Sequence, residues 1–300
     1  MTTTADSTGG SDQSSYPVHD AVKHGKNDEV AALLDADVSN ISAVDEHGRT
    51  PLHMAVLFQN LAAAEMLVAG GANCNEEDAT GRTPLHLAAY AVDRLDVLRL
   101  LLDAGASLER NNWAGQTPLL VAIARGNNPG VELLIERGAD CMARNEERAT
   151  PLHVAMAYRN HTAARLLLDH GARFGAVNKD GKSALHIAME IGDIGSAVML
   201  LERGARVDTM DQAGRTPLDC AKDWNLLQKI FMHVSARWEE AKVAQRKAEA
   251  ELAAEREKRE LAEVKIRELE GSVEQLLVRK LHMRHSVSLP PGTVGPVPED

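Results

Sequence analysis

The chain has 300 residues, with 44 Asp and Glu against 33 Lys and Arg, which gives a formal net charge of -11. Apolar residues make up 44% of the sequence, enough for a sizeable core, and the length allows one or two domains. Aromatic residues make up 3%, which favours a helical fold rich in Ala and Leu over a β-sandwich. General nucleic-acid or anionic-membrane binding needs positive surface, so we expect neither nucleic acid nor membrane as a partner.

The cysteines and the N-terminus indicate the compartment. Cys74, Cys141 and Cys220 form no C-x-x-C pair, and such a sparse, odd set is typical of a reducing environment. Residues 1–16 are rich in Ser, Thr and Gly, lack the apolar core of a secretory signal and are expected to form a disordered arm. No apolar stretch approaches the length of a membrane span. The expectation is a soluble, cytoplasmic protein, with nuclear entry left open.

A tetrapeptide related to Thr-Pro-Leu-His recurs along the chain at intervals of 33 or 34 residues. Its six copies begin at Thr50, Thr83, Thr117, Thr150, Ser183 and Thr216. Thr followed by Pro predicts a helix start, because the hydroxyl caps free N–H groups and Pro at the first helical position loses no donor. The third copy carries Leu120 and the sixth Asp219 in place of His.

Three further positions keep the same register. A Gly two residues before the Thr predicts a tight turn, except in the fourth copy, where Arg148 replaces it. A Gly-Ala pair after Leu-Leu predicts the left-handed stop of a second helix. A small residue fills one slot of the first helix, at Ala55, Ala88, Ala122, Ala155, Ala188 and Ala221. Each copy therefore predicts a turn followed by two helices.

These motifs resemble the ankyrin repeat, and the resemblance covers residues 17–234, with a degenerate first copy that suits an N-terminal cap. It implies an all-α solenoid of about seven helix pairs. In this family the motif His joins adjacent loops by hydrogen bonds, and partner proteins bind a concave face made of hairpin tips and the ends of the first helices. One extra residue near Asp93 is expected to reshape a loop.

Residues 235–285 predict a long charged helix, because no Gly or Pro interrupts residues 226–270, a span of about 45 residues. An interrupted heptad of apolar residues supports either a weak homodimer through residues 234–280 or a solvated single helix. Residues 286–300 contain four prolines and predict a disordered tail. Ser286 and Ser288 lie in a short match to a basophilic kinase site, which makes them candidate phosphorylation sites.

The family's variable contact positions predict the binding residues. Five of the nine aromatic residues fall in these slots, namely Phe58, Tyr90, Trp113, Tyr158 and Trp224. Arg49 and Arg82 occupy further slots at the hairpins. Aromatic and Arg side chains carry much of the binding energy of protein interfaces. The alternative interpretation is that the aromatic residues pack on the next repeat.

No catalytic or metal-binding motif is present, so the sequence predicts no enzyme and no cofactor. Gly181-Lys182-Ser183 resembles the end of a phosphate loop, but Gly175 lies one residue too far upstream. The expected function is a non-enzymatic adaptor or scaffold that binds a partner protein. The alternative is a regulatory or assembly-chaperone subunit of a larger enzyme complex. Residues 1–234 hold 21 Lys and Arg against 31 Asp and Glu, a net charge of -10, which favours a partner with basic patches.

Overall fold

The structure is a computed structural model that describes residues 16–92, 94–221 and 224–285. At several positions of the last helix, Trp224 and Trp238 among them, only the backbone is described. The contacts divide the chain into two compact units, Met1–Val234 and Ser235–Asp300. Most of the expected N-terminal arm, the expected tail, and the candidate sites Ser286 and Ser288 lie outside the described residues.

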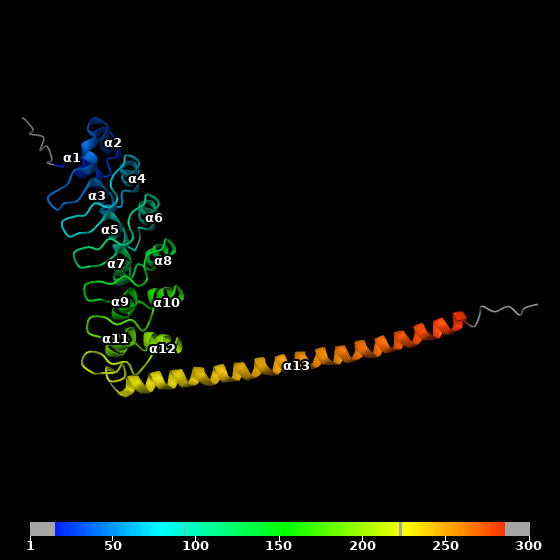
Figure 1. The fold of residues 1–300 in the computed structure, drawn as a ribbon. Coiled ribbons are helices and arrows are strands. Elements are labelled where there is room, and N and C mark those ends of the chain that lie inside the picture. Colours follow the sequence, from blue (N-terminus) through cyan, green and yellow to red (C-terminus); the bar gives the residue numbers. More distant parts are fainter. Residues whose placement is uncertain (1–15, 93, 222–223, 286–300) are drawn as a thin grey trace, which may run out of the picture. The chain divides into compact units, whose positions relative to one another are not determined.

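The first unit contains two columns of helices (Figure 1). The first helices of the pairs form one column: α1 (Pro17–Lys23), α3 (Pro51–Leu57), α5 (Pro84–Tyr90), α7 (Pro118–Arg125), α9 (Pro151–Ala157) and α11 (Ala184–Ile191). The second helices form the other: α2 (Asn27–Ala36), α4 (Leu61–Ala69), α6 (Leu95–Asp103), α8 (Asn128–Glu136), α10 (His161–Asp169) and α12 (Ile194–Glu202). A short 3-10 helix, η1 (Val38–Ser42), follows α2. The described residues contain no β-strand, only one isolated bridge between Val177 and Ser183.

Each helix packs on its own partner and on its equivalents in the neighbouring repeats, so that one continuous core runs through the stack. The recurring alanine slot lies at the centre of this packing, because Ala55, Ala88, Ala122, Ala155 and Ala188 are all fully buried. A methyl group is the largest side chain that lets helices approach this closely without a gap. The core therefore depends on contacts between repeats, as in a one-dimensional stack.

Six hairpins precede the recurring tetrapeptides: hairpin 1 (45–49), hairpin 2 (78–82), hairpin 3 (112–116), hairpin 4 (145–149), hairpin 5 (178–182) and hairpin 6 (211–215). In each, the backbone N–H of the first residue donates to the carbonyl of the fifth at 2.9 to 3.2 Å. The first residue is Asp or Asn, and its side-chain oxygen accepts the N–H of the fifth residue at 2.9 to 3.0 Å. The Asp or Asn side chain thus closes the turn on itself.

In five of the repeats a buried His links the start of the first helix to the next hairpin. Its Nδ1 accepts the N–H of the Thr or Ser three residues earlier at 3.1 to 3.2 Å in α3, α5, α9 and α11. The Nε2 atoms of His19, His53, His86, His153 and His186 lie 2.7 to 3.1 Å from carbonyls of the following hairpin. A carbonyl only accepts, so Nε2 carries the proton; in His53, His86 and His153 Nδ1 also accepts an N–H, so these three imidazoles are neutral.

Hairpins 3 and 4 lack both links that join the other neighbouring hairpins. Elsewhere along the described hairpins, a backbone N–H donates to a carbonyl of the preceding hairpin at 2.8 to 3.1 Å. No such bond connects Glu146 to Ala114, and Leu120 stands where the other repeats carry His. Arg148 occupies the turn position of hairpin 4 with φ 55°, the region that favours glycine. Hairpins 3 and 4 therefore lie in contact without a hydrogen bond between them.

The prediction of a seventh helix pair is wrong in one respect, because residues 217–220 form turns rather than a helix. Asp219 replaces the motif His, and its carboxylate accepts the N–H and hydroxyl of Thr216 at 2.8 and 2.7 Å. The chain then continues into α13 (Trp224–His285) instead of another hairpin. Leu218, within these turns, is exposed. Helix α13 has 62 residues and includes Gly271.

The contact between hairpins 2 and 3 gives a test of the stacking. A Cβ at Gly81 would lie 2.9 Å from the backbone N of Trp113 and 2.3 Å from its indole Cδ1, and Gly81 has φ 73°. Gly81→Ala therefore adds a backbone clash to the strain of a left-handed alanine. We expect it to lower the free energy of unfolding by about 2–3 kcal/mol, measured by urea denaturation.

Gly105→Ala is the matched control. It lies in the same repeat with φ 81°, but a Cβ there would have no atom within 4 Å, so only strain remains. We expect a loss of about 1 kcal/mol. Equal losses for the two variants would show that hairpins 2 and 3 are not in tight contact.

The neutral imidazoles predict a loss of stability in mild acid. Burial lowers the pKa of His53, His86 and His153 from 6.5, so the unfolded chain takes up protons at a higher pH than the folded chain does. Their contribution is complete above about pH 6.5 and is lost as the pH falls below it. Burial alone would raise the pKa of Asp78 and Asp193, but hydrogen bonds outweigh it and lower both from 3.8, so these carboxylates remain charged.

Thermal melts at pH 7.5 and pH 5.5 measure this effect. We expect a lower Tm at pH 5.5, and a smaller difference between the two pH values for His86→Gln. His170→Gln removes an exposed His at the end of α10 and is expected to keep the wild-type difference. A pH dependence that is unchanged by His86→Gln would contradict the assignment to the buried imidazoles.

Candidate functional site

The candidate site is the surface made by the hairpin tips and the C-terminal ends of the first helices, here called the hairpin–helix face. Four of the predicted aromatic residues lie there with large exposed fractions: Phe58 46%, Tyr90 50%, Trp113 70% and Tyr158 60%. These exposed fractions do not decide between binding and the alternative of packing on the next repeat, since Arg125 of the next repeat stacks on Tyr90. The side chain of Trp224, the fifth, lies outside the described residues.

Phe58, Tyr90 and Tyr158 reach this face because their first helices end there. Phe58 and Tyr158 are the residues that directly follow α3 and α9, and Tyr90 is the last residue of α5. The preceding turns of these helices are buried, so the chain exposes its side chains only where the helix leaves the core. The repeat period then places these aromatic residues at equivalent positions of their repeats, on one side of the stack.

A cationic side chain lies over each of two of these rings. The guanidinium of Arg125, the last residue of α7, lies 3.9 Å from the ring centroid of Tyr90. The ammonium of Lys23, the last residue of α1, lies 5.9 Å from that of Phe58. Both distances fall within the range of cation–π attraction. Each pair joins two neighbouring repeats and limits the motion of the aromatic side chain.

Trp113 is held in a different way, at the tip of hairpin 3. Its backbone N–H donates to Thr80 O at 3.1 Å, and its indole lies directly over Gly81 of hairpin 2. The side chain is nevertheless the most exposed of the four. One side of the indole therefore rests on the preceding hairpin while most of its surface remains open to solvent.

Arg49 and Arg82 have partners inside their own hairpins. Arg49 pairs with Asp45 at 2.6 Å, and Arg82 pairs with Asp78 at 2.8 Å. Burial would raise the pKa of Asp78, but its bonds from Thr80 and Arg82 outweigh this and lower it. These arginines support the hairpins, which accounts for their presence without a partner. Their role in binding stays a prediction.

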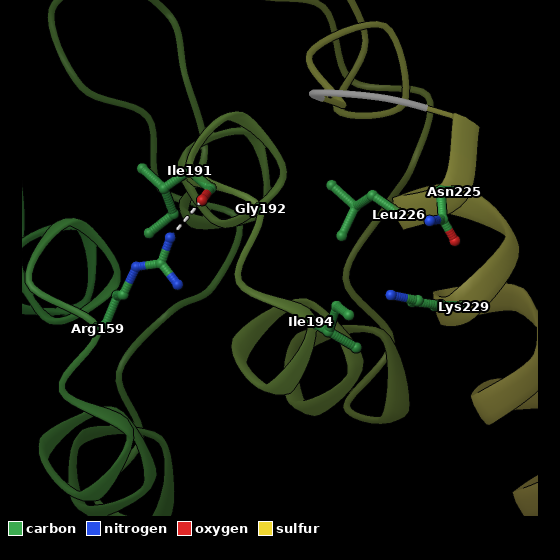
Figure 2. A pocket seen from close by; sticks show the side chains of 7 residues that line it. All are labelled: Arg159, Ile191, Gly192, Ile194, Asn225, Leu226 and Lys229. Atoms are coloured by element: carbon green, nitrogen blue, oxygen red, sulfur yellow. Dashed lines mark hydrogen bonds between the residues drawn. The ribbon is translucent and has the colours of Figure 1, made fainter.

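A small cavity of about 250 Å³ lies near the C-terminal end of the first unit. It is lined by Arg159, Ile191, Gly192, Ile194, Asn225, Leu226 and Lys229. Figure 2 shows Arg159, bonded to the carbonyl of Ile191, on one side and Lys229 on the other, with apolar side chains between them. Sequence reasoning did not find it, because its residues come from α11, α12, α13 and the turns after α9 and α11, which only tertiary packing brings together. Both of its cations are on exposed residues.

One group superficially resembles a hydrolytic triad. His161 Nε2 lies 2.8 Å from Asp193 Oδ2, and Ser196 Oγ donates to the same oxygen at 2.7 Å. In a triad the imidazole must reach the serine hydroxyl, whereas here the carboxylate stands between the two. Ser196 is fully buried, and Asp193 caps the N-terminus of α12. The arrangement is that of a helix cap.

Metal sites and reactive thiols are likewise not indicated in the part of the chain that the structure describes. The described residues contain no cluster of three or more His, Cys, Asp or Glu placed to hold a metal ion. Burial raises the pKa of the Cys74 and Cys141 thiols, which disfavours the reactive thiolate. None of the helices described has an apolar stretch long enough to cross a bilayer. The hairpin–helix face is thus the feature with the clearest capacity to bind.

Two comparisons with known sequences identify the repeats. A profile of three ankyrin repeats matches residues 5–78, 60–145 and 109–178, and a single-repeat profile matches residues 180–212. The chain belongs to the ankyrin repeat family. Ankyrin repeat domains generally mediate protein–protein interaction and are typically not enzymes. No curated protein sequence matches the chain.

Solved ankyrin repeat structures share this fold. The ankyrin repeat domain of Bcl-3, described as a unique member of the IkappaB protein family, has a TM-score of 0.67 and 32% sequence identity over 72% of this chain and 97% of its own. The human ASB11 ankyrin repeat domain has a TM-score of 0.62 and 25% identity over 72% of this chain and 96% of its own. These comparisons confirm the all-α solenoid predicted from the sequence.

Proposed function

We propose that this ankyrin repeat protein is a non-enzymatic adaptor that holds a partner protein against its hairpin–helix face. One observation carries the proposal: four of the nine aromatic side chains of the chain are about half exposed or more on this single face. Exposed aromatic residues are scarce on a protein that has so few, and they are the side chains that most often dominate interface energy. Tyr and Trp also lose little conformational entropy on binding.

The fold supports this role in a second way. The face is built from hairpins closed by Asp or Asn side chains and from helix ends anchored in the core, so a partner would meet a surface that is already ordered. A pre-formed surface lowers the entropic cost of association. The cation–π pair of Arg125 and Tyr90 adds to this order at the centre of the face.

A quantitative pull-down from native lysate tests the proposal with Tyr90→Ala/Trp113→Ala. We expect a defined set of proteins to be recovered with wild type and lost with the variant, because two central contacts are removed. Both side chains are at least half exposed, so the Tm should fall by only a few degrees. Val38→Ala/Met210→Ala truncates two exposed apolar side chains in other segments and should retain the partners. Recovery of the same proteins by all three baits would refute binding through these aromatic residues.

The same experiment addresses the alternative function. A transient adaptor would be recovered with partners in varying amounts, whereas a regulatory or assembly subunit would be recovered in a fixed ratio with one enzyme complex. Size-exclusion chromatography of the eluted material measures that ratio. A stable stoichiometric complex would favour the alternative over the adaptor.

The C-terminal helix supports a second proposal, that α13 self-associates weakly through its heptad seam. The middle of this seam contains Ala248, Leu252, Glu255, Arg259 and Ala262, and the side chain of Leu252 is 53% exposed. The next two seam positions, Glu255 and Arg259, form an ion pair 3.0 Å long along the helix itself, which a single solvated helix would also display. A polar centre of this kind weakens a two-stranded coiled coil without preventing it.

Sedimentation velocity of the full chain across a concentration series measures this association. We expect Leu252→Glu to raise the dimer dissociation constant at least about tenfold, because it places a charge in the seam. Leu261→Glu is the control, since Leu261 is also exposed but lies on the opposite side of the helix. A wild-type chain that remains monomeric throughout would establish the solvated single helix.

A further inference from the structure

We infer that hairpins 3 and 4 form a subsite for a positively charged side chain of the partner, an arginine or a lysine. The inference rests on the proposed function and specifies its chemistry at one place on the hairpin–helix face. Three observations meet at this junction: an exposed indole held in place, two neighbouring carboxylates, and a gap in the bonds between hairpins.

The indole is the first component. Trp113 is 70% exposed, yet it is fixed by its backbone bond to Thr80 and by its contact with Gly81. It therefore presents an ordered π surface to solvent. Indole is the aromatic ring that attracts cations most strongly, and the same face already contains a guanidinium over Tyr90. No cation of the chain is placed over Trp113 among the described residues.

The carboxylates are the second component. The second residue of each hairpin lies against the turn of the preceding hairpin, so Trp113 contacts Gly81 and Glu146 contacts Gly115. Glu146 is thus the immediate neighbour of Trp113 along the stack, at the spacing of adjacent repeats, about 10 Å. Glu147 follows it at the tip, and both are exposed. An extended arginine side chain is long enough to cover the indole and reach one of these carboxylates.

The other charges nearby leave this attraction in place. Arg82 is neutralised by Asp78. Lys179 lies 3.8 Å from Glu147, but both side chains are about two-thirds exposed, so the pair is weak. Arg144, just before hairpin 4, and Arg148, within it, are adjacent cations that oppose a positive ligand, and neither has an ion-pair partner among the described residues. Glu146 has no ion pair there either. The net charge of -10 over residues 1–234 adds long-range attraction.

The missing hydrogen bond between hairpins 3 and 4 is the third component. The carbonyl of Ala114 and the N–H of Glu146 do not bond to each other, although the equivalent groups pair at four other hairpin junctions. Because Leu120 stands in place of the motif His, no imidazole at this position binds a carbonyl of hairpin 4. Backbone donors and acceptors are strongly hydrogen-bonding groups, and here two of them are left for solvent or for a ligand. A partner segment that places its cation over Trp113 passes directly beside them.

Nuclear magnetic resonance titration of the full chain tests the subsite. The probe is a seven-residue peptide with two arginines separated by glycine and serine, and both of its ends are blocked so that they carry no charge. The control is the same peptide with citrulline in place of arginine, because citrulline is isosteric but neutral. At about 50 mM salt, where surface charges are less screened, we expect the arginine peptide to shift the amide signals of residues 113–116 and 146–147. The citrulline peptide should leave them unchanged.

Three variants with opposite expectations separate charge recognition from unfolding. Trp113→Ala should abolish the shifts, and Glu146→Gln/Glu147→Gln should weaken binding about three- to tenfold, because cation–π and ion-pair contacts are lost. Arg148→Gly should strengthen binding about two- to threefold, because it removes a like charge and restores glycine at a left-handed position. A damaged fold cannot produce a gain in affinity.

Equal shifts with arginine and citrulline, shifts confined to other residues, or an unchanged affinity in the Gln variant would overturn the subsite. The pull-down distinguishes this from failure of the proposed function. If Tyr90→Ala/Trp113→Ala loses the partners while Glu146→Gln/Glu147→Gln retains them, the adaptor function stands and the cation subsite is wrong. If neither variant loses partners, the proposed function itself fails.

Discussion

The stack depends on a neutral imidazole buried at the start of the first helix. A single His ring satisfies two backbone groups at once, the N–H at its own helix start and a carbonyl of the next hairpin 29 or 30 residues away. Both groups are buried or nearly so, and leaving either one unpaired would cost about 1–3 kcal/mol. The His therefore converts a local helix cap into a bond between repeats. This explains why the tetrapeptide recurs at a fixed period rather than at helix starts in general.

The repeats that lack this His differ locally from the others. In the third repeat, Leu120 is fully buried and contributes apolar contact instead of a bond, and the hairpins on either side of it are not hydrogen-bonded to each other. In the sixth, Asp219 turns its carboxylate back to Thr216, and the first helix does not form. Between these points the helices still pack in one continuous core. Hydrogen bonding between hairpins and helix packing are thus separable supports of the solenoid.

The capacity to bind arises where these supports leave side chains outside the core. The ends of the first helices and the hairpin tips must emerge from the stack, and this chain places most of its described aromatic residues there. The same positions carry charges that the hairpins use internally, as with Arg82 and Asp78, or leave open, as with Glu146. The contacts within each hairpin decide which charged side chains have an internal ion pair and which are left for a partner protein. The junction of hairpins 3 and 4 is where an open aromatic ring, open carboxylates and open backbone groups coincide.

The repeat register was readable from the residues themselves. A fixed interval, a capping Thr with Pro, a turn Gly and a buried Ala each have a local steric or hydrogen-bonding cause, so the fold class and the positions of Phe58, Tyr90, Trp113 and Tyr158 followed directly. The pairing of Arg49 and Arg82 within their hairpins, the stacking of Arg125 on Tyr90, and the unpaired junction at hairpin 4 did not. These features depend on which side chains meet across repeats some 33 residues apart. Local sequence sets each repeat, but only the packed stack determines which neighbour a side chain touches and which surface stays open.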